Sequence, residues 1–297
     1  MMKKKAWSRW ILALAVVWPC MAVARDRVRE KENFDFDWKF ILNADDRANA
    51  GMQVSEAGWQ DGQLPHDWSI SQDFDPKLSG SNGHLPGGIG WYRKTFRVDK
   101  EDKGRRIAVL FDGIYSRSDV YVNGHHLGFR PYGFCYQEYN LTPYLNYGAE
   151  NVLAVRVNNP LEHDSVARWY TGAGIYRHAW LVKTAKVHVA SYGTYVTTPV
   201  VTAERAEVRV RTSVANEAER TKTLSVCQQI TDGEGRTVVQ SGKQPLQVAA
   251  GQTADTEHTL KIPRPQLWDT EHPYLYTLHT VVYDGRKLVD TYETVFG

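Results

Sequence analysis

Short runs of alternating apolar and polar residues constrain the fold of this chain more than any other feature. Residues 106–111 read Arg-Ile-Ala-Val-Leu-Phe, and residues 151–157 read Asn-Val-Leu-Ala-Val-Arg-Val. Turn residues separate such runs, and Asn123-Gly124 favours a type I′ hairpin because both residues tolerate a positive φ. No useful window of the sequence shows apolar residues at helical spacing. The pattern predicts an all-β protein made of sandwiches or barrels.

The length of 297 residues suits two domains, and the composition changes near residue 188. Residues 25–187 are rich in Trp, Tyr, Gly and His and have long loops, which is typical of a jelly roll. Residues 188–297 have plainer runs at regular spacing, which is typical of an immunoglobulin-like sandwich of roughly seven strands. Strands are expected at 206–214, 222–230, 237–239, 256–262 and 274–283. Because no low-complexity linker separates the two domains, we expect them to abut.

The N-terminal segment, residues 1–24, has the pattern of a cleaved signal peptide. Basic residues at positions 3–5 and 9 precede an apolar run at 10–18 that is too short to span a bilayer. Ala22-Val23-Ala24 is a small-x-small cleavage site, so a secreted or periplasmic protein without a membrane span is expected. Anchoring through a lipid on Cys20 is the alternative, but the preceding Val17-Trp18-Pro19 lacks the small residues that this processing needs.

Composition excludes several classes of function. With 42% apolar and 24% charged residues, the chain has the composition of a globular protein. Its net charge is +2, and no cluster of Lys and Arg in the sequence indicates a nucleic-acid-binding surface. Cys135 and Cys227, one in each domain, are not a disulfide framework. His125 and His126 are adjacent on an expected strand and point to opposite faces, so they cannot chelate one metal ion. We expect neither a cofactor nor a metal site.

Four stretches in order carry a family resemblance: residues 57–70 (Ala-Gly-Trp-Gln-Asp-Gly-Gln-Leu-Pro-His-Asp-Trp-Ser-Ile), 87–96 (Gly-Gly-Ile-Gly-Trp-Tyr-Arg-Lys-Thr-Phe), 168–177 (Arg-Trp-Tyr-Thr-Gly-Ala-Gly-Ile-Tyr-Arg) and 267–276 (Leu-Trp-Asp-Thr-Glu-His-Pro-Tyr-Leu-Tyr). The first three resemble the sugar-binding domain that opens family 2 glycoside hydrolases of the β-galactosidase type. The fourth resembles the end of the immunoglobulin-like domain that follows it. The resemblance covers nearly all of residues 33–297.

Candidate sugar contacts follow from these stretches. Arg168, Trp169 and Tyr170 form a polar-aromatic cluster beside glycines that permit close backbone approach, and aromatic faces suit sugar C–H groups. The residues alone also fit a loop that packs against a neighbouring domain and touches no sugar. The resemblance implies that the loop lies where the first domain meets a catalytic barrel, with Arg168 near the rim of the pocket. His66 and Asp67 complete the predicted substrate-binding set, but general loop chemistry favours a structural turn capped by Asp67 over a catalytic pair.

The residues of glycoside chemistry are expected elsewhere. A retaining glycosidase needs two carboxylates about 5–5.5 Å apart, which the family carries as glutamates on a (β/α)8 barrel of about 250 residues. This sequence does not show such an alternation of strands and helices. Asn216-Glu217 could be mistaken for the acid/base motif of the family, but it lies between two expected strands and is interpreted as a turn. We therefore expect the non-catalytic front part of a secreted β-galactosidase-type enzyme, which retains configuration when intact. Relatives that act on glucuronides or mannosides share these front domains.

The expected partners are a β-galactoside-like carbohydrate and the barrel of the same polypeptide, and the resemblance leaves open a homo-oligomer. The alternative from another class is a free-standing carbohydrate-binding module, since jelly rolls with aromatic loops do this work. A structural surface protein is a third hypothesis, and the ten Trp residues argue against it.

Overall fold

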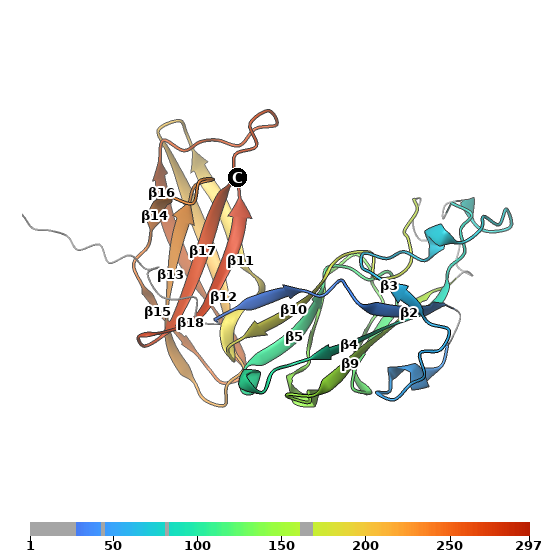
Figure 1. Ribbon diagram of the computed structural model, residues 1–297. Coiled ribbons are helices and arrows are strands. Elements are labelled where there is room, and N and C mark those ends of the chain that lie inside the picture. Colours follow the sequence, from blue (N-terminus) through green and yellow to red (C-terminus); the bar gives the residue numbers. More distant parts are fainter. Residues whose placement is uncertain (1–27, 43–44, 81–82, 161–168) are drawn as a thin grey trace, which may run out of the picture.

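The structure is a computed structural model that describes residues 28–42, 45–80, 83–160 and 169–297. It confirms the all-β prediction, because these residues form two sandwiches of antiparallel sheets with only short 3-10 turns between strands (Figure 1). Residues 1–24 and Arg168 lie outside the described residues. Within the described ranges, no helix has the length and apolar character needed to cross a membrane.

The first sandwich consists of a six-stranded sheet, ordered β3-β2-β4-β9-β6-β7, and a four-stranded sheet, ordered β1-β10-β5-β8. Its elements are β1 (Glu30–Asn33), β2 (Trp38–Leu42), η1 (Arg47–Ala50), β3 (Gln60–Gly62), η2 (Ser69–Ser71), β4 (Gly88–Arg97), η4 (Lys100–Asp102), β5 (Arg106–Phe111), β6 (Ser118–Val122), β7 (His125–Arg130), β8 (Gln137–Asn140), η5 (Thr142–Tyr144), β9 (Glu150–Asn159) and β10 (Ala179–Thr184).

Alternation along these strands places one apolar set between the two sheets. On β9, Leu153, Val155 and Val157 are fully buried in the main core, which also takes Phe111 of β5. The opposite face of β9 is covered as well, because Ala154 joins a smaller cluster of buried residues with Trp91 of β4. The alternation of the run at 151–157 is typical of a half-buried strand, but the structure buries both faces of β9.

The predicted hairpin at Asn123-Gly124 is confirmed. Both residues have positive φ, +51° and +84°, and they join β6 to β7. Asp112-Gly113 follows the run at 106–111 and has the composition of a tight turn, but it does not join two strands of one sheet. β5 pairs with β10 and β8, whereas β6 belongs to the other sheet, so Asp112 lies in a segment that crosses between the sheets.

The second sandwich faces a three-stranded sheet, β11-β12-β16, against a five-stranded sheet, β14-β13-β17-β18 with β15 also on β13. β14 and β15 pair with different halves of β13, residues 229–231 and 222–226, so together they act as one interrupted edge strand. Its strands are β11 (Val187–Val201), β12 (Arg205–Asn216), β13 (Lys222–Thr231), β14 (Thr237–Gln240), β15 (Gln244–Val248), β16 (Gln252–Pro263), β17 (Tyr276–Asp284) and β18 (Lys287–Phe296).

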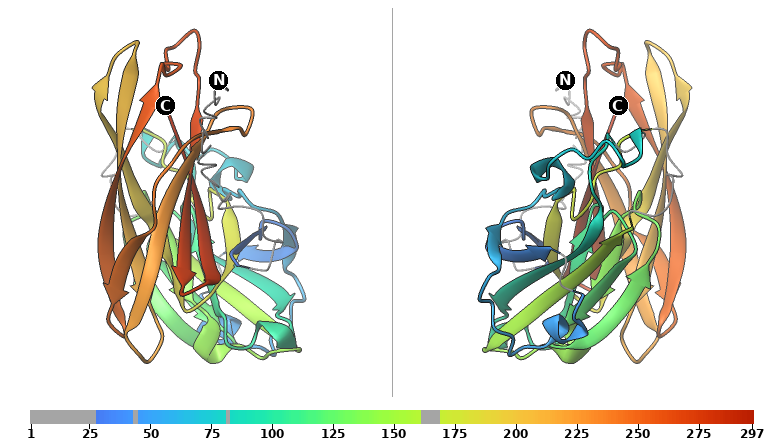
Figure 2. Two further views of the ribbon diagram at one scale, coloured as in Figure 1. Left: turned by 90° about the vertical axis from the view of Figure 1, so that its left-hand side faces the viewer. Right: turned by 90° about the vertical axis from the view of Figure 1, so that its right-hand side faces the viewer.

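Only a short connection joins the two sandwiches, since β10 ends at Thr184 and β11 begins at Val187. Figures 1 and 2 show the second sandwich standing beside one end of the first. The Arg29 guanidinium, just before β1, donates to both carboxylate oxygens of Asp290 on β18, at 3.0 and 2.7 Å. Arg106 of β5 pairs with Glu217 at 2.7 Å. Ion pairs from two separate places therefore fix the junction.

Candidate functional site

Two loops of the first sandwich pair with each other at one end of the molecule. The His66 amide donates to the Ile175 carbonyl at 2.8 Å, and the Trp68 amide donates to the Ala173 carbonyl at 3.1 Å. These bonds join the segment after β3 to the segment before β10. Two of the four stretches that carry the family resemblance are therefore one structural unit.

The Asp67 carboxylate holds this unit together. Its Oδ1 accepts the amide protons of Ser69 and Ala173, each at 3.0 Å, and its Oδ2 accepts the Tyr170 hydroxyl proton at 2.6 Å. The bond to Ser69 caps a turn, as the sequence suggested, while the other two reach across to the second loop. Because both carboxylate oxygens are already engaged, Asp67 acts in this chain as a positioning residue for that loop.

Glycines in the second loop make this close approach possible. A Cβ added to Gly172, whose φ is +74°, would lie 2.7 Å from the Asp67 Oδ2. A Cβ added to Gly174, whose φ is +124°, would lie 2.6 Å from the His66 carbonyl oxygen and would also collide with the Tyr92 hydroxyl. Both positions therefore require glycine on grounds of backbone conformation and of space.

His66 belongs to the floor beneath the loops. Its Nδ1 lies 2.8 Å from the Tyr92 hydroxyl, and its ring packs against Phe40 with 4.8 Å between ring centroids. Burial lowers the pKa of His66, although the charge of Asp67 opposes that shift. Trp68 is fully buried beside Phe40. A neutral imidazole in an aromatic floor fits a structural role better than acid-base catalysis.

The aromatic side chains of the second loop point to solvent. Trp169 is 64% exposed and Tyr170 is 38% exposed. Burial, followed by the hydrogen bond to Asp67, raises the pKa of Tyr170, which keeps its hydroxyl protonated and able to donate this hydrogen bond even at alkaline pH. The long loop between η2 and β4 comes near, because a Cβ on Gly83 would contact the Tyr170 ring at 3.9 Å. The loops present an exposed aromatic surface at one end of the first sandwich.

Of the predicted substrate-binding set, the structure brings Asp67 and Tyr170 into contact and places Trp169 beside them. His66 lies beneath, and Arg168 lies outside the described residues. The buried floor of Phe40, Trp68 and Tyr92 was not predicted, because these residues come from three separate segments and the sequence gives no sign of which aromatic partners they meet.

Asn216-Glu217 is occupied by structural contacts. The Asn216 amide group is buried and donates to the carbonyls of Arg220 and Val248, at 2.9 and 3.0 Å. Glu217 pairs with Arg106 and accepts from Asn140 at 3.3 Å. Among the described residues, no group of three or more His, Cys, Asp or Glu side chains is arranged to hold a metal ion.

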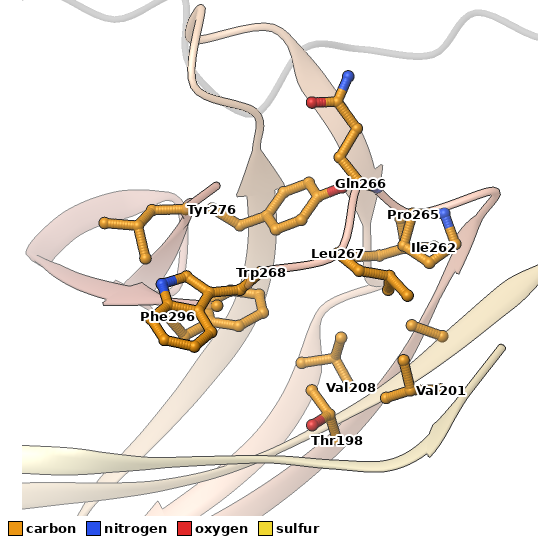
Figure 3. Close-up of a pocket in the computed structure, with 13 residues that line it drawn as sticks. Thr198, Val201, Val208, Ile262, Pro265, Gln266, Leu267, Trp268, Tyr276 and Phe296 are labelled. Atoms are coloured by element: carbon orange, nitrogen blue, oxygen red, sulfur yellow. Dashed lines mark hydrogen bonds between the residues drawn. The ribbon is translucent and has the colours of Figure 1, made fainter. Parts of the chain in front are cut away.

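A pocket of about 440 Å³ opens on the second sandwich, where the loop 264–275 crosses the ends of β11, β12 and β16 (Figure 3). Leu267 and Trp268 lie at its mouth, and Phe296 lines it from β18. The sequence singled out residues 267–276 only for the family resemblance that they carry. Leu267, Trp268 and Leu275, in a loop that is otherwise largely polar, were the available signal for an apolar site.

Two adjoining β-sandwiches with an aromatic loop on the first are consistent with the family resemblance in the sequence. Comparison of the sequence with known families agrees. The profile for the sugar binding domain of glycosyl hydrolases family 2 matches residues 32–185, and the profile for glycosyl hydrolases family 2 matches residues 187–297. The chain belongs to glycosyl hydrolases family 2.

Several members of the family are similar over most of the chain. A β-galactosidase of Bacteroides ovatus is 43% identical over 91% of the chain and 31% of its own length. A β-glucuronidase of Formosa agariphila is 33% identical over 91% of the chain and 29% of its own length. A solved family 2 structure from Bacteroides cellulosilyticus is 37% identical with a TM-score of 0.80, covering 90% of the chain and 36% of that structure. The chain thus spans about a third of the length of these relatives.

Proposed function

We propose that the chain is the non-catalytic front part of a secreted family 2 hydrolase that acts on terminal β-galactosides and retains the anomeric configuration. Its loops would form one wall of the sugar pocket, and its two sandwiches would hold a catalytic barrel in place. The observation that carries the proposal is the loop held by Asp67, in which Trp169 and Tyr170 are exposed while Gly172 and Gly174 let the backbone pack closely against Asp67 and His66.

The chemistry of the loops indicates which roles belong to this chain and which to the remaining polypeptide. Trp169 offers a flat apolar face to sugar C–H groups, and Tyr170 adds a partly exposed ring beside it. The Asp67 carboxylate is committed to three hydrogen bonds. The chain therefore contributes binding and orientation, whereas the acid/base and nucleophilic carboxylates would come from the remaining polypeptide.

A galactoside is preferred over a glucuronide as the substrate because the Bacteroides β-galactosidase is more similar to the chain than the Formosa β-glucuronidase, at 43% against 33% identity. The signal-peptide pattern of residues 1–24 supports a secreted or periplasmic location. The partners would be a terminal β-galactoside and the barrel of the same polypeptide, within an oligomer or a monomer.

Grafting tests this proposal. The chain replaces the matched front part of the Bacteroides ovatus β-galactosidase and, as a control, that of the Formosa agariphila β-glucuronidase. We expect the galactosidase graft to keep kcat/KM for a nitrophenyl galactoside within about tenfold of the parent, and the glucuronidase graft to lose clearly more than that. Equal retention in both grafts would overturn the substrate assignment. Two inactive grafts would overturn the proposed function.

The alternative, a free-standing carbohydrate-binding module, is favoured by one observation: Trp169 is already exposed in the chain by itself. Titration of the chain with galactosides and galactose oligomers separates the two functions. A module binds the sugar without a barrel, and Trp169→Ala then abolishes binding. The front part of an enzyme binds weakly or not at all until the barrel completes the pocket.

A further inference from the structure

The pocket on the second sandwich is surrounded by large apolar side chains that water reaches. Val201, Leu267, Trp268 and Leu275 all line it, and each is between 45% and 50% exposed. Contiguous exposed apolar side chains around a cavity are uncommon on a free surface and mark sites of interaction. We therefore expect the pocket to bind a partner that covers these apolar side chains.

The pocket is built into the fold. Its floor consists of fully packed core residues, among them Val208 of β12 and Ile262 of β16. The loop that forms its mouth is tied down, because the Gln266 amide donates to the Tyr276 hydroxyl at 2.9 Å. The Tyr276 ring in turn stacks on Phe296 with 5.8 Å between ring centroids. The surface is therefore preformed, so binding of a partner would require little further ordering of the loop.

The chemistry of the lining selects the kind of partner. Besides the Tyr276 hydroxyl and the Trp268 indole N–H, the polar side chains of the lining are those of Thr198 and Gln266, and none of the described side chains that line it is charged. A free sugar would leave most of its hydroxyls unpaired against such a surface, which costs free energy. Apolar side chains of a polypeptide fit it better, since their burial is favourable.

We propose that this pocket docks apolar side chains from the polypeptide that makes up the other two thirds of the related enzymes. The length of the relatives argues for this occupant over a second copy of the chain, because the chain spans only 31% of the Bacteroides ovatus protein and 36% of the solved Bacteroides cellulosilyticus structure. The inference rests on the proposed function and assigns the surface through which the second sandwich would hold the catalytic part.

Leu267→Ser/Leu275→Ser tests the docking, because both residues lie in a loop and are half-exposed in the chain itself. The variant is made in the 297-residue chain and in the active galactosidase graft, and Phe129→Ser is the matched control. Phe129 lies on β7 of the first sandwich, is 53% exposed and does not line the pocket. Melting temperatures are compared, together with the sedimentation of the chain.

We expect the double variant to lower the melting temperature of the chain by less than about 2 °C and that of the graft by more than about 5 °C, while Phe129→Ser changes both equally. Equal shifts in chain and graft for the double variant would overturn the docking proposal. A chain dimer that the double variant dissociates would overturn it in favour of self-association. An inactive graft with wild-type residues would instead count against the proposed function, from which the docking follows.

Discussion

The Tyr170 hydroxyl donates a 2.6 Å hydrogen bond to the Asp67 carboxylate, although 103 residues separate the two along the chain. The same carboxylate binds the backbone amide of Ala173. One side chain thus fixes both the aromatic group and the backbone of the loop that presents it. The position of the exposed aromatic surface depends on a residue that itself has no free oxygen.

Asp67→Ala is expected to lower the free energy of unfolding by about 1–3 kcal/mol, because two backbone amides lose their acceptor. Tyr170→Phe removes one partly exposed bond and is expected to cost less than about 1 kcal/mol. Urea unfolding of both variants measures the difference. Equal costs would show that Asp67 supports the loop only through Tyr170, contrary to the role assigned here.

Gly172→Ala is expected to destabilise the chain by more than Gly235→Ala. Both glycines have similar positive φ, +74° and +78°, so both alanines carry a backbone cost of about 1–2 kcal/mol. At Gly172 the added Cβ also meets the Asp67 carboxylate, whereas at Gly235 nothing lies within 4 Å. Thermal unfolding of the two variants isolates the collision. If both variants lost the same stability, the loop at Gly172 would be able to shift away from Asp67 without a free-energy cost.

Arg29→Ala is expected to cost about 3–5 kcal/mol at pH 7, because it leaves the Asp290 carboxylate buried without its cation. Burial raises the pKa of Asp290, and Arg29 opposes that shift, so loss of Arg29 raises the pKa further. At a pH between the two pKa values, a carboxyl whose pKa is higher in the folded than in the unfolded chain binds more protons when folded. The free energy of unfolding therefore rises as the pH falls toward about 4, the pKa of an unfolded Asp.

The cost of Arg29→Ala should therefore be smaller at pH 5 than at pH 7, as measured by chemical unfolding at both values. Asp290→Asn in the same background should recover part of the stability at pH 7, because it removes the charge. A cost independent of pH, with no recovery, would contradict this account of the junction.

The sequence predicted the strands that alternate cleanly and the turns that need special backbone angles, such as Asn123-Gly124. All five strands expected after residue 188 are present. The 15-residue β11 was missed because a bulge near Tyr192, with φ +52°, interrupts its alternation. β15 was missed because Pro245 lies inside it, which is tolerated where it pairs with only one strand.

The candidate site was only partly predictable for a related reason. Asp67 was recognisable as a turn cap from its neighbours, but its bonds to Tyr170 and Ala173 cross about a hundred residues. No local pattern reports such a contact. The Arg29–Asp290 pair, 261 residues apart, is hidden in the same way.

Trp169→Ala separates binding from folding. Because the indole is 64% exposed, its loss should change the free energy of unfolding by less than about 0.5 kcal/mol. In the galactosidase graft it should raise KM for the galactoside by about threefold or more if the indole stacks on the sugar. An unchanged KM would remove Trp169 from the pocket wall.

We propose that this chain supplies binding surface and support, and that the catalytic carboxylates come from the remaining polypeptide of the enzyme. Hydrolysis of nitrophenyl β-galactoside by the purified 297-residue chain, measured beside the galactosidase graft at equal concentration, tests this claim most directly. We predict turnover by the graft and none above background by the chain. Turnover by the chain alone, at a rate that scales with its concentration, would contradict the claim.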